Sequence, residues 1–151
     1  MEQYNQKEII DLIKRKMESH LSRFPQGVEG QMKPALHSFN YEDRSIAFFY
    51  DVQSWMLNPG GIMHGGLIAA GFDSVMGMLA HVFSAEDEIV TVNLQITYIK
   101  PIPGNSKLLI TAKISSAGRK MSFISADARC LENPNILNAA ANGIYYIKSA
   151  K

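Results

Sequence analysis

The sequence predicts an α+β domain in which an antiparallel sheet wraps around one long helix. The helix is expected from an apolar run at residues 65–83, which contains a single carboxylate. The sheet is expected from the second half of the chain, where apolar and polar side chains alternate in short segments. Strands joined by short connections pair antiparallel, which leaves the helix to be covered by the sheet. At 151 residues the chain has room for one core, so residues 1–151 are expected to form a single domain.

The first elements expected are an amphipathic helix at residues 3–22 and a pair of strands. In the helix, apolar side chains recur at four-residue steps with charged residues between them. A Phe-Pro-Gln-Gly segment ends this helix. Residues 35–41 and 44–52 are typical of strands and are joined by a tight turn at Glu42-Asp43. A loop then leads into the apolar helix.

Four strands are expected after the apolar helix. In the first of them, residues 90–98, alternation places Val92 and Leu94 on the buried face and Thr91 on the opposite face. Turns rich in Gly, Pro and Asn separate the later strands. These are expected at 107–115, 122–131 and 136–147.

The composition narrows the classes of function. The net charge is +1, the pI is near 7.9 and no basic run occurs, so a nucleic-acid partner is not expected. A single cysteine, Cys130, fits a reducing compartment, and residues 1–14 are too polar and acidic for a secretory signal. A membrane span at 65–83 is not expected, because Asp73 would lie in the middle of the lipid. The expected location is the cytoplasm.

The residues that most strongly indicate chemistry are the loop 58–66 and Asp73. The loop reads Asn-Pro-Gly-Gly-Ile-Met-His-Gly-Gly, and it places free backbone N–H groups at the start of the apolar helix. Asp73 lies within the apolar run, where a buried carboxylate needs a partner. Two interpretations stay open for Asp73: a catalytic base, or a carboxylate held structurally by Ser, Thr or backbone donors.

One stripe of the apolar helix consists of Gly65, Ala69, Asp73 and Gly77, at four-residue steps. Its small residues indicate close packing of the sheet, or a channel kept free of side chains, and both can hold. A helical rise of ~1.5 Å per residue separates Gly65 from Asp73 by ~12 Å. A reacting carbonyl must lie within ~3 Å of both the attacking group and the stabilising group. If both residues are catalytic they come from different subunits, which predicts a homodimer.

The pattern Asn58-x-x-Gly61-x-x-His64-Gly65-Gly66, followed by Asp73, resembles the hotdog-fold acyl-CoA thioesterases. The resemblance is to the PaaI-like (phenylacetate-degradation) branch of the 4-hydroxybenzoyl-CoA thioesterase-like superfamily. It extends through the strand 90–98 with Pro101, through Gly118-Arg119 and through the closing strand, and covers about residues 30–148. It implies a curved sheet around the long helix and an assembly of dimers that also pair into tetramers.

The resemblance also implies roles for individual residues in thioester hydrolysis. The Gly65 N–H would polarise the thioester carbonyl, helped by Asn58. His64 would orient Asn58 or assist near the departing sulfur. Asp73 of the partner chain would act as base or nucleophile, and Thr91 would position the water or the carboxylate. A coenzyme A thiolate departs easily, so one base and one oxyanion donor can be enough.

Substrate contacts and cofactors complete the expectation. Gly66 and Met63 would border the substrate, and Arg119 and Lys120, with Lys100 and Lys107, are candidates for coenzyme A phosphates. Methionines could line an acyl pocket or simply fill the core. No cofactor is expected. No zinc site is expected either, because the histidines show no ligand spacing with Cys130.

Two other functions remain open for this fold. An enoyl-thioester hydratase or dehydratase would pair a histidine with a helix carboxylate, whereas the His-Gly-Gly form followed by Asp73 favours hydrolysis. A non-catalytic acyl-CoA-binding protein is the other alternative.

Overall fold

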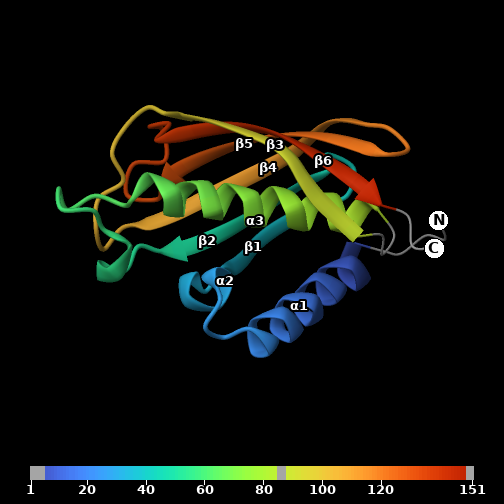
Figure 1. The fold of residues 1–151 in the computed structure, drawn as a ribbon, viewed down its shortest axis with the longest axis horizontal. Helices are drawn as coiled ribbons and strands as arrows, with labels where there is room; N and C mark the ends of the chain where they lie inside the picture. Colours follow the sequence, from blue (N-terminus) through green and yellow to red (C-terminus); the bar gives the residue numbers. More distant parts are fainter. Residues whose placement is uncertain (1–5, 85–87, 149–151) are drawn as a thin grey trace.

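A computed structural model of the chain describes residues 6–84 and 88–148, and in it a six-stranded antiparallel sheet wraps around a long helix (Figure 1). The α+β class predicted from the sequence is therefore confirmed. The strand order is β1-β2-β4-β5-β6-β3. The helices are α1 (Gln6–Arg23), α2 (Val28–Met32) and α3 (Gly65–Phe83), and the strands are β1 (Ala35–Asn40), β2 (Ser45–Asp51), β3 (Glu88–Tyr98), β4 (Lys107–Ala117), β5 (Met121–Cys130) and β6 (Ala139–Lys148).

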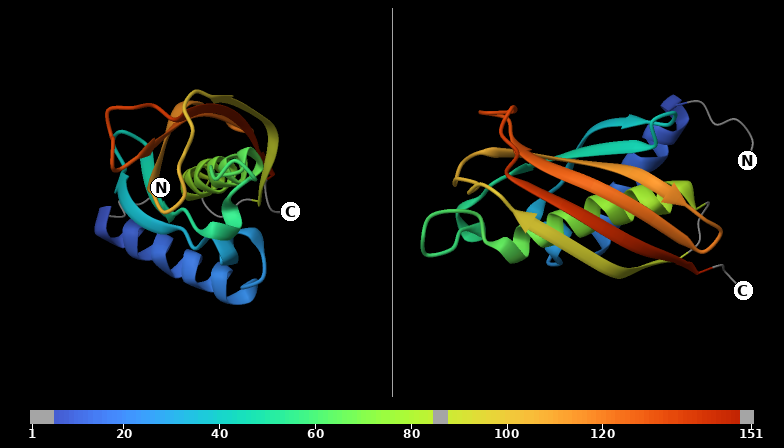
Figure 2. Two further views of the ribbon diagram at one scale, coloured as in Figure 1. Left: turned by 90° about the vertical axis from the view of Figure 1, so that its left-hand side faces the viewer. Right: turned by 90° about the horizontal axis from the view of Figure 1, so that it is seen from above.

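Helix α3 is the central element, and the view along its axis shows the strands curving around it (Figure 2). Its side chains Phe72, Met76 and Leu79 are fully buried in the core. By length and composition α3 could also cross a membrane. In this fold the concave face of the sheet covers its buried side chains, which stabilises the helix by removing apolar surface from water.

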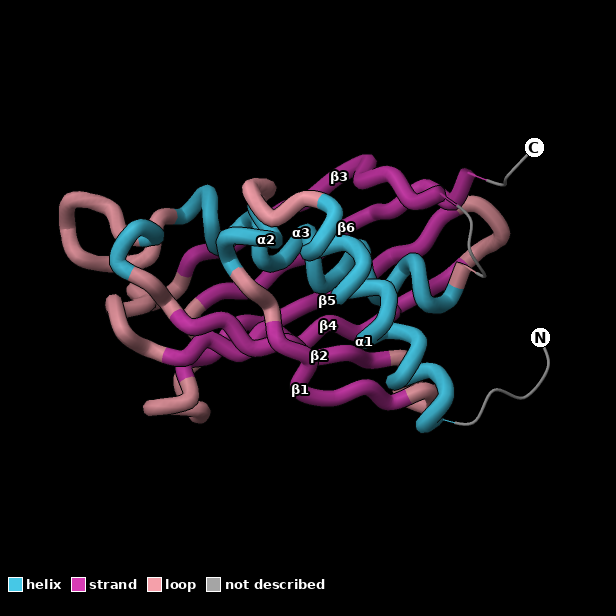
Figure 3. Tube along the Cα trace, turned by 90° about the horizontal axis from the view of Figure 1, so that it is seen from below, coloured by secondary structure: helices cyan, strands magenta, loops and turns pink. Residues whose placement is uncertain are grey.

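Helices α1 and α2 lie on the open side of the sheet, the side that also holds α3 (Figure 3). Helix α1 buries Ile9, Ile13 and Met17, the apolar positions expected from the four-residue spacing. Residues 3–5 of the helix expected at 3–22 lie outside the described residues. Helix α2 was not predicted, because five residues are too few to show a helical period. Gly30 allows it to form, since a Cβ there would lie 2.5 Å from the Pro25 carbonyl oxygen.

Two expectations about the sheet need correction. Strand β3 does not pair with β4, its neighbour in sequence, but with β6, so it forms one edge of the sheet. The last strand begins at Ala139 and not at residue 136. A turn closed by the Ile136 N–H and the Asn133 carbonyl precedes it. The buried Asn138 side chain then accepts from the Cys130 N–H and donates to the Pro101 carbonyl, which fixes the neighbouring loop.

A β-bulge in β3 changes which side chains face α3. Thr91 pairs with Tyr145 and Asn93 with Ile144, which leaves Val92 as the extra residue. The continuous alternation expected for 90–98 is therefore wrong at Val92, which is 56% exposed. Before the bulge Thr91 faces the helix, and after it Leu94 packs against the core.

Candidate functional site

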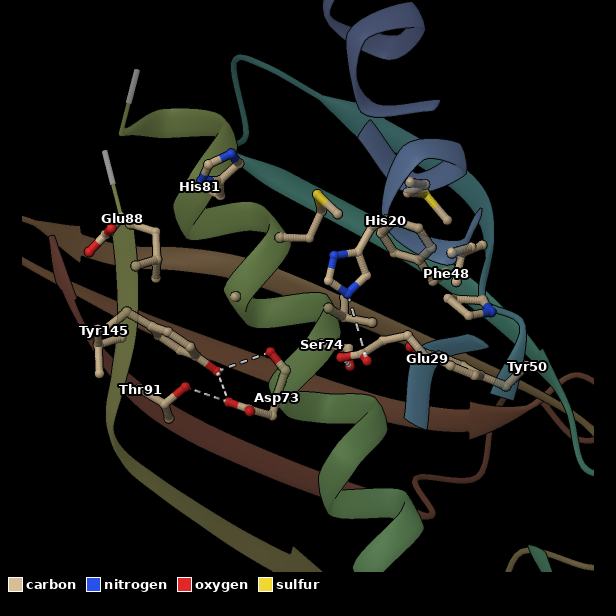
Figure 4. A pocket seen from close by; sticks show the side chains of 18 residues that line it. His20, Glu29, Phe48, Tyr50, Asp73, Ser74, His81, Glu88, Thr91 and Tyr145 are labelled. Carbon is tan, nitrogen blue, oxygen red and sulfur yellow. Dashed lines mark hydrogen bonds and ion pairs between the residues drawn. The ribbon is translucent and has the colours of Figure 1, made fainter. Parts of the chain in front are cut away.

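Asp73 lies midway along α3, where two hydroxyl groups hold its carboxylate. The Thr91 hydroxyl donates to Oδ1 at 2.8 Å, and the Tyr145 hydroxyl donates to the same oxygen at 3.1 Å (Figure 4). Among the described residues, Oδ2 has no hydrogen-bond partner. The carboxylate is half-buried in the single chain, less than the sequence led us to expect. One oxygen is thus fixed and the other is available to a substrate or a water molecule.

The β-bulge explains why Thr91 can reach Asp73. Without the extra residue at Val92, strand alternation would place Thr91 and Leu94 on opposite faces of β3. The bulge returns both to the face that covers α3, with Leu94 against the core and Thr91 beside the carboxylate. Sheet bulges often re-aim a side chain in this way next to an active site.

Tyr145 is the partner of Asp73 that sequence reasoning missed. It lies opposite Thr91 in the pairing of β3 with β6, and its ring is 1% exposed. Burial raises the pKa of its phenol, and the negative charge of Asp73 raises it further. The phenol therefore stays protonated and donates its hydrogen bond throughout the neutral range. The alternation in β6 could have placed Tyr145 on the inner face, but not beside Asp73, because strand order is not visible in the sequence.

Asp73 borders a pocket of about 540 Å³ that runs over the outward face of α3. Strand β3 forms one wall, and helices α1 and α2 form the other (Figure 4). Gly77 forms part of the lining, and a Cβ added there would meet only an ordinary contact, 3.7 Å from the Tyr145 ring. Packing does not demand a glycine at this position. The interpretation of the small-residue stripe as a cleared channel is supported here.

The other end of the same stripe lies beside Tyr98 of β3. A Cβ at Gly65 would lie 3.4 Å from the Tyr98 ring, and the Tyr98 hydroxyl donates to the Gly65 carbonyl at 2.8 Å. Strand β3 thus holds α3 at two points, through Thr91 and through Tyr98. At both ends of the stripe a Cβ would make only an ordinary contact, so close packing does not account for Gly65 or Gly77.

The loop 58–66 is held by its own side chains. The Asn58 Oδ1 accepts from the Gly60 N–H at 2.9 Å, and the Asn58 carbonyl accepts from the Gly61 N–H at 2.9 Å. Gly61 has a φ of +76°, a conformation that favours glycine. The loop therefore presents a fixed backbone at the start of α3.

His64 is the N-cap residue of α3, and its Nδ1 accepts from the Gly66 N–H at 3.0 Å. Among the described residues, no hydrogen bond joins the His64 ring to Asn58. The Gly65 N–H donates to no described residue, because the first N–H groups of a helix have no partner within it. The helix start thus offers the Gly65 N–H to a ligand, while the Gly66 N–H is already occupied.

The remaining candidates lie apart from Asp73. Met63 is 2% exposed and belongs to the core. Arg119 and Lys120 are exposed in the turn between β4 and β5, at the opposite end of the molecule from the loop 58–66 (Figure 1). Within one chain they cannot meet a substrate at Gly65. The described residues contain no cluster of three or more His, Cys, Asp or Glu side chains that could hold a metal ion.

The methionines divide between the core and the pocket. Met56 and Met76 are fully buried, Met78 lines the pocket together with Met17, and Met121 is exposed on the outer face of the sheet. Both interpretations of the methionines, core filling and pocket lining, therefore apply to part of the set.

Comparison with known proteins agrees with this fold. Residues 60–136 match the thioesterase superfamily. Acyl-coenzyme A thioesterase 13 of Mus musculus is 33% identical over 76 residues, which are 50% of this chain and 54% of the mouse protein. The chain thus spans about half the length of this curated relative.

Two solved structures share the fold at low sequence identity. Thioesterase superfamily member 2 of zebrafish has a TM-score of 0.76 at 21% identity, with 96% of this chain and 99% of that chain covered. The PaaI protein of the Escherichia coli phenylacetic acid degradation operon has a TM-score of 0.73 at 14% identity, with 91% and 96% covered. The sequence match and the fold together show that the chain belongs to the thioesterase superfamily.

Proposed function

We propose that the protein is an acyl-CoA thioesterase that hydrolyses a thioester to a carboxylic acid and free coenzyme A. The observation that carries the proposal is the Asp73 carboxylate, which borders the pocket and is held by Thr91 and Tyr145 through one oxygen only. The name of the mouse relative, an acyl-coenzyme A thioesterase, supports the same reaction. The PaaI-like branch and the cytoplasmic location stay predictions.

In the proposed reaction Asp73 acts as base or nucleophile. As a base, its free oxygen takes a proton from water while the water oxygen attacks the thioester carbonyl. As a nucleophile, it attacks the carbonyl itself and forms an anhydride that water then hydrolyses. In both routes the C–S bond breaks, and coenzyme A leaves as a thiolate that takes up a proton. The Gly65 N–H stabilises the negative charge on the carbonyl oxygen.

We propose that the two groups come from different subunits of a homodimer. They lie ~12 Å apart along one continuous helix, which is too far for one carbonyl to reach both. Strand β3 supports a dimer because it is an edge of 11 residues without Pro or Lys, the residues that commonly protect such edges. Val90 and Val92 on this edge are 51% and 56% exposed. Pairing of two copies through β3 would cover them, and a further pairing of dimers is the tetramer implied by the resemblance.

The first test measures thiol release from a panel of acyl-CoA thioesters. The wild-type protein should release free thiol, and Asp73→Asn should lower kcat by roughly 10²–10⁴-fold, the usual contribution of a positioned acid or base. Asp51→Asn is the matched control, because the Asp51 carboxylate is 76% exposed and lies outside the pocket. Thiol release by this variant should equal that of the wild type. Unchanged release by Asp73→Asn would refute the mechanism. Hydration of an enoyl-CoA without thiol release would identify the hydratase alternative.

A further inference from the structure

A second polar group lies in the same pocket, on the opposite flank of α3 from Thr91. It consists of Glu29 from α2, Ser74 from α3 and His20 from α1 (Figure 4). The Ser74 hydroxyl donates to Glu29 Oε1 at 2.9 Å, and His20 Nε2 lies 3.9 Å from Oε2. Because Ser74 directly follows Asp73, this group sits close to the proposed reaction centre.

The pocket suits the acyl part of the substrate and not its coenzyme A part. None of the residues that line it is Lys or Arg, whereas Asp73, Glu29 and Glu88 are acidic. The Lys148 ammonium group pairs with Glu88, and the Lys16 ammonium group lies 2.8 Å from Nε2 of the lining His81. The charges of Asp73 and Glu29 remain, and they disfavour the phosphates of coenzyme A in this part of the pocket. Much of the remaining lining is apolar, as an acyl chain requires. The apolar residues include Met17, Leu21, Phe48, Val75, Met78 and Ile89.

Glu29 has hydrogen-bonding capacity left for a ligand. An ionised carboxylate can accept about four hydrogen bonds. Ser74 uses one of these, and the 3.9 Å separation from His20 is too long for a second. The Glu29 side chain is 39% exposed and borders the pocket. Its charge also acts on the buried Tyr50, since burial and then Glu29 raise the pKa of that phenol.

We propose that Glu29, held in place by Ser74, selects acyl groups that carry a hydrogen-bond donor on the chain, either a hydroxyl or an ammonium group. This inference rests on the proposed thioesterase function and assigns its substrate class. A donor in this position binds the free lone pairs of Glu29, whereas a plain hydrocarbon leaves the carboxylate without that partner. A carboxylate on the acyl chain is repelled by Glu29 and Asp73 together.

The test compares octanoyl-CoA with its monohydroxylated isomers, with the chain that ends in an amine and with the chain that ends in a carboxylate. For the wild-type protein, kcat/KM for the best hydroxylated or amino chain should exceed that for octanoyl-CoA about tenfold, as expected for one net hydrogen bond to a charged group. The chain ending in a carboxylate should be the poorest substrate. Glu29→Gln should reduce the preference to about two-fold, since an amide oxygen accepts without a charge.

A matched control lies in the same pocket. Glu88→Gln changes another glutamate of the lining, but the Lys148 ammonium group already pairs with it at 2.7 Å. The ratio of hydroxylated to plain substrate should therefore be unchanged in Glu88→Gln. If Glu29→Gln lowers kcat/KM equally for every substrate, Glu29 only docks α2 on α3 and the proposal is wrong. A wild-type preference for octanoyl-CoA over all hydroxylated and amino chains would also overturn it.

Binding measurements separate this proposal from the thioesterase proposal. In Asp73→Asn the thioesters should stay intact, and calorimetry should show about tenfold tighter binding of the preferred hydroxylated or amino chain than of octanoyl-CoA. That difference should fall in the double variant Asp73→Asn with Glu29→Gln. A binding preference without any hydrolysis by the wild-type protein would support the role of Glu29 and refute the thioesterase. Equal binding of all chains would refute the role of Glu29, whatever the rate of hydrolysis.

Discussion

At the scale of single residues, Asp73 receives hydrogen bonds from two neutral hydroxyl groups and from no cation among the described residues. Neutral donors orient a carboxylate without pairing its charge with a cation. Thr91 and Tyr145 come from paired positions on β3 and β6. Since both bind Oδ1, they fix the orientation of the carboxylate and leave Oδ2 without a hydrogen-bond partner among the described residues.

The role of Thr91 can be tested with two substitutions of similar size. Thr91→Val keeps the shape but removes the hydroxyl, and kcat should fall roughly 10–100-fold, as for the loss of a hydrogen bond to a charged group. Thr91→Ser keeps the hydroxyl and should stay within a few-fold of the wild type. KM should change little in either variant. Steady-state kinetics on one acyl-CoA decides the matter, and equal rates for Val and Ser would show that the hydroxyl is unimportant.

Sequence reasoning found some of these residues and missed others for a physical reason. Asp73 stands out because a carboxylate in an apolar helix needs a function or a partner. Thr91 was named from the resemblance, although the alternation alone placed it on the wrong face of its strand. Tyr145 and Glu29 could not be found, since each meets α3 only through the tertiary fold, 72 and 45 residues away along the chain.

At the scale of elements, helix α3 depends on a defined start. The His64 side chain caps it by accepting from the Gly66 N–H, while the Tyr98 hydroxyl holds the Gly65 carbonyl. Together these contacts fix the peptide groups around the Gly65 N–H. A histidine commonly suggests acid–base chemistry. Here the His64 Nδ1 accepts a hydrogen bond from the helix, which gives the residue a structural role as a cap.

Substitution of His64 separates capping from chemistry. His64→Ala should lower the free energy of unfolding by about 1 kcal/mol, the usual loss for a helix cap. His64→Ser supplies another capping oxygen, so both stability and most of the thioesterase activity should be retained. Denaturant unfolding and thiol release measured on the same samples make the comparison. If Ser restores stability but not activity, the histidine acts on the substrate and not only on the helix.

Most helices and strands could be predicted from the sequence, and the differences between the expected and the observed elements have local causes. The two long helices and the six strands could be predicted from the spacing of apolar side chains and from the turn residues, because each element has one buried face. The five-residue helix α2 and the bulge at Val92 were missed because neither produces a repeating pattern. The position of β3 beside β6 was missed because pairing depends on how the sheet closes around α3 and not on order in the sequence.

At the scale of the whole molecule, the two groups proposed for the reaction are too far apart in one chain to act on the same carbonyl. The Gly65 N–H lies at the first turn of α3, and Asp73 lies two turns further along the same rigid helix. Strand β3 carries residues that contact both places, and its outer edge is unpaired in the described chain. A second copy added along this edge by two-fold symmetry would bring the Gly65 N–H of one chain close to Asp73 of the other.

Mixing two inactive variants tests this arrangement. Gly65→Pro removes the N–H but suits the first position of a helix, and the extended backbone of His64 (φ −63°, ψ 132°) is compatible with a following proline. Gly65→Ala keeps the N–H and should remain active, which makes it the matched control.

Gly65→Pro and Asp73→Asn should each be inactive alone. After refolding of an equal mixture, half of the dimers are mixed and each has one intact site, so about a quarter of wild-type activity should return. A site contained within one chain would give no recovery, and a monomer by light scattering would exclude sharing altogether.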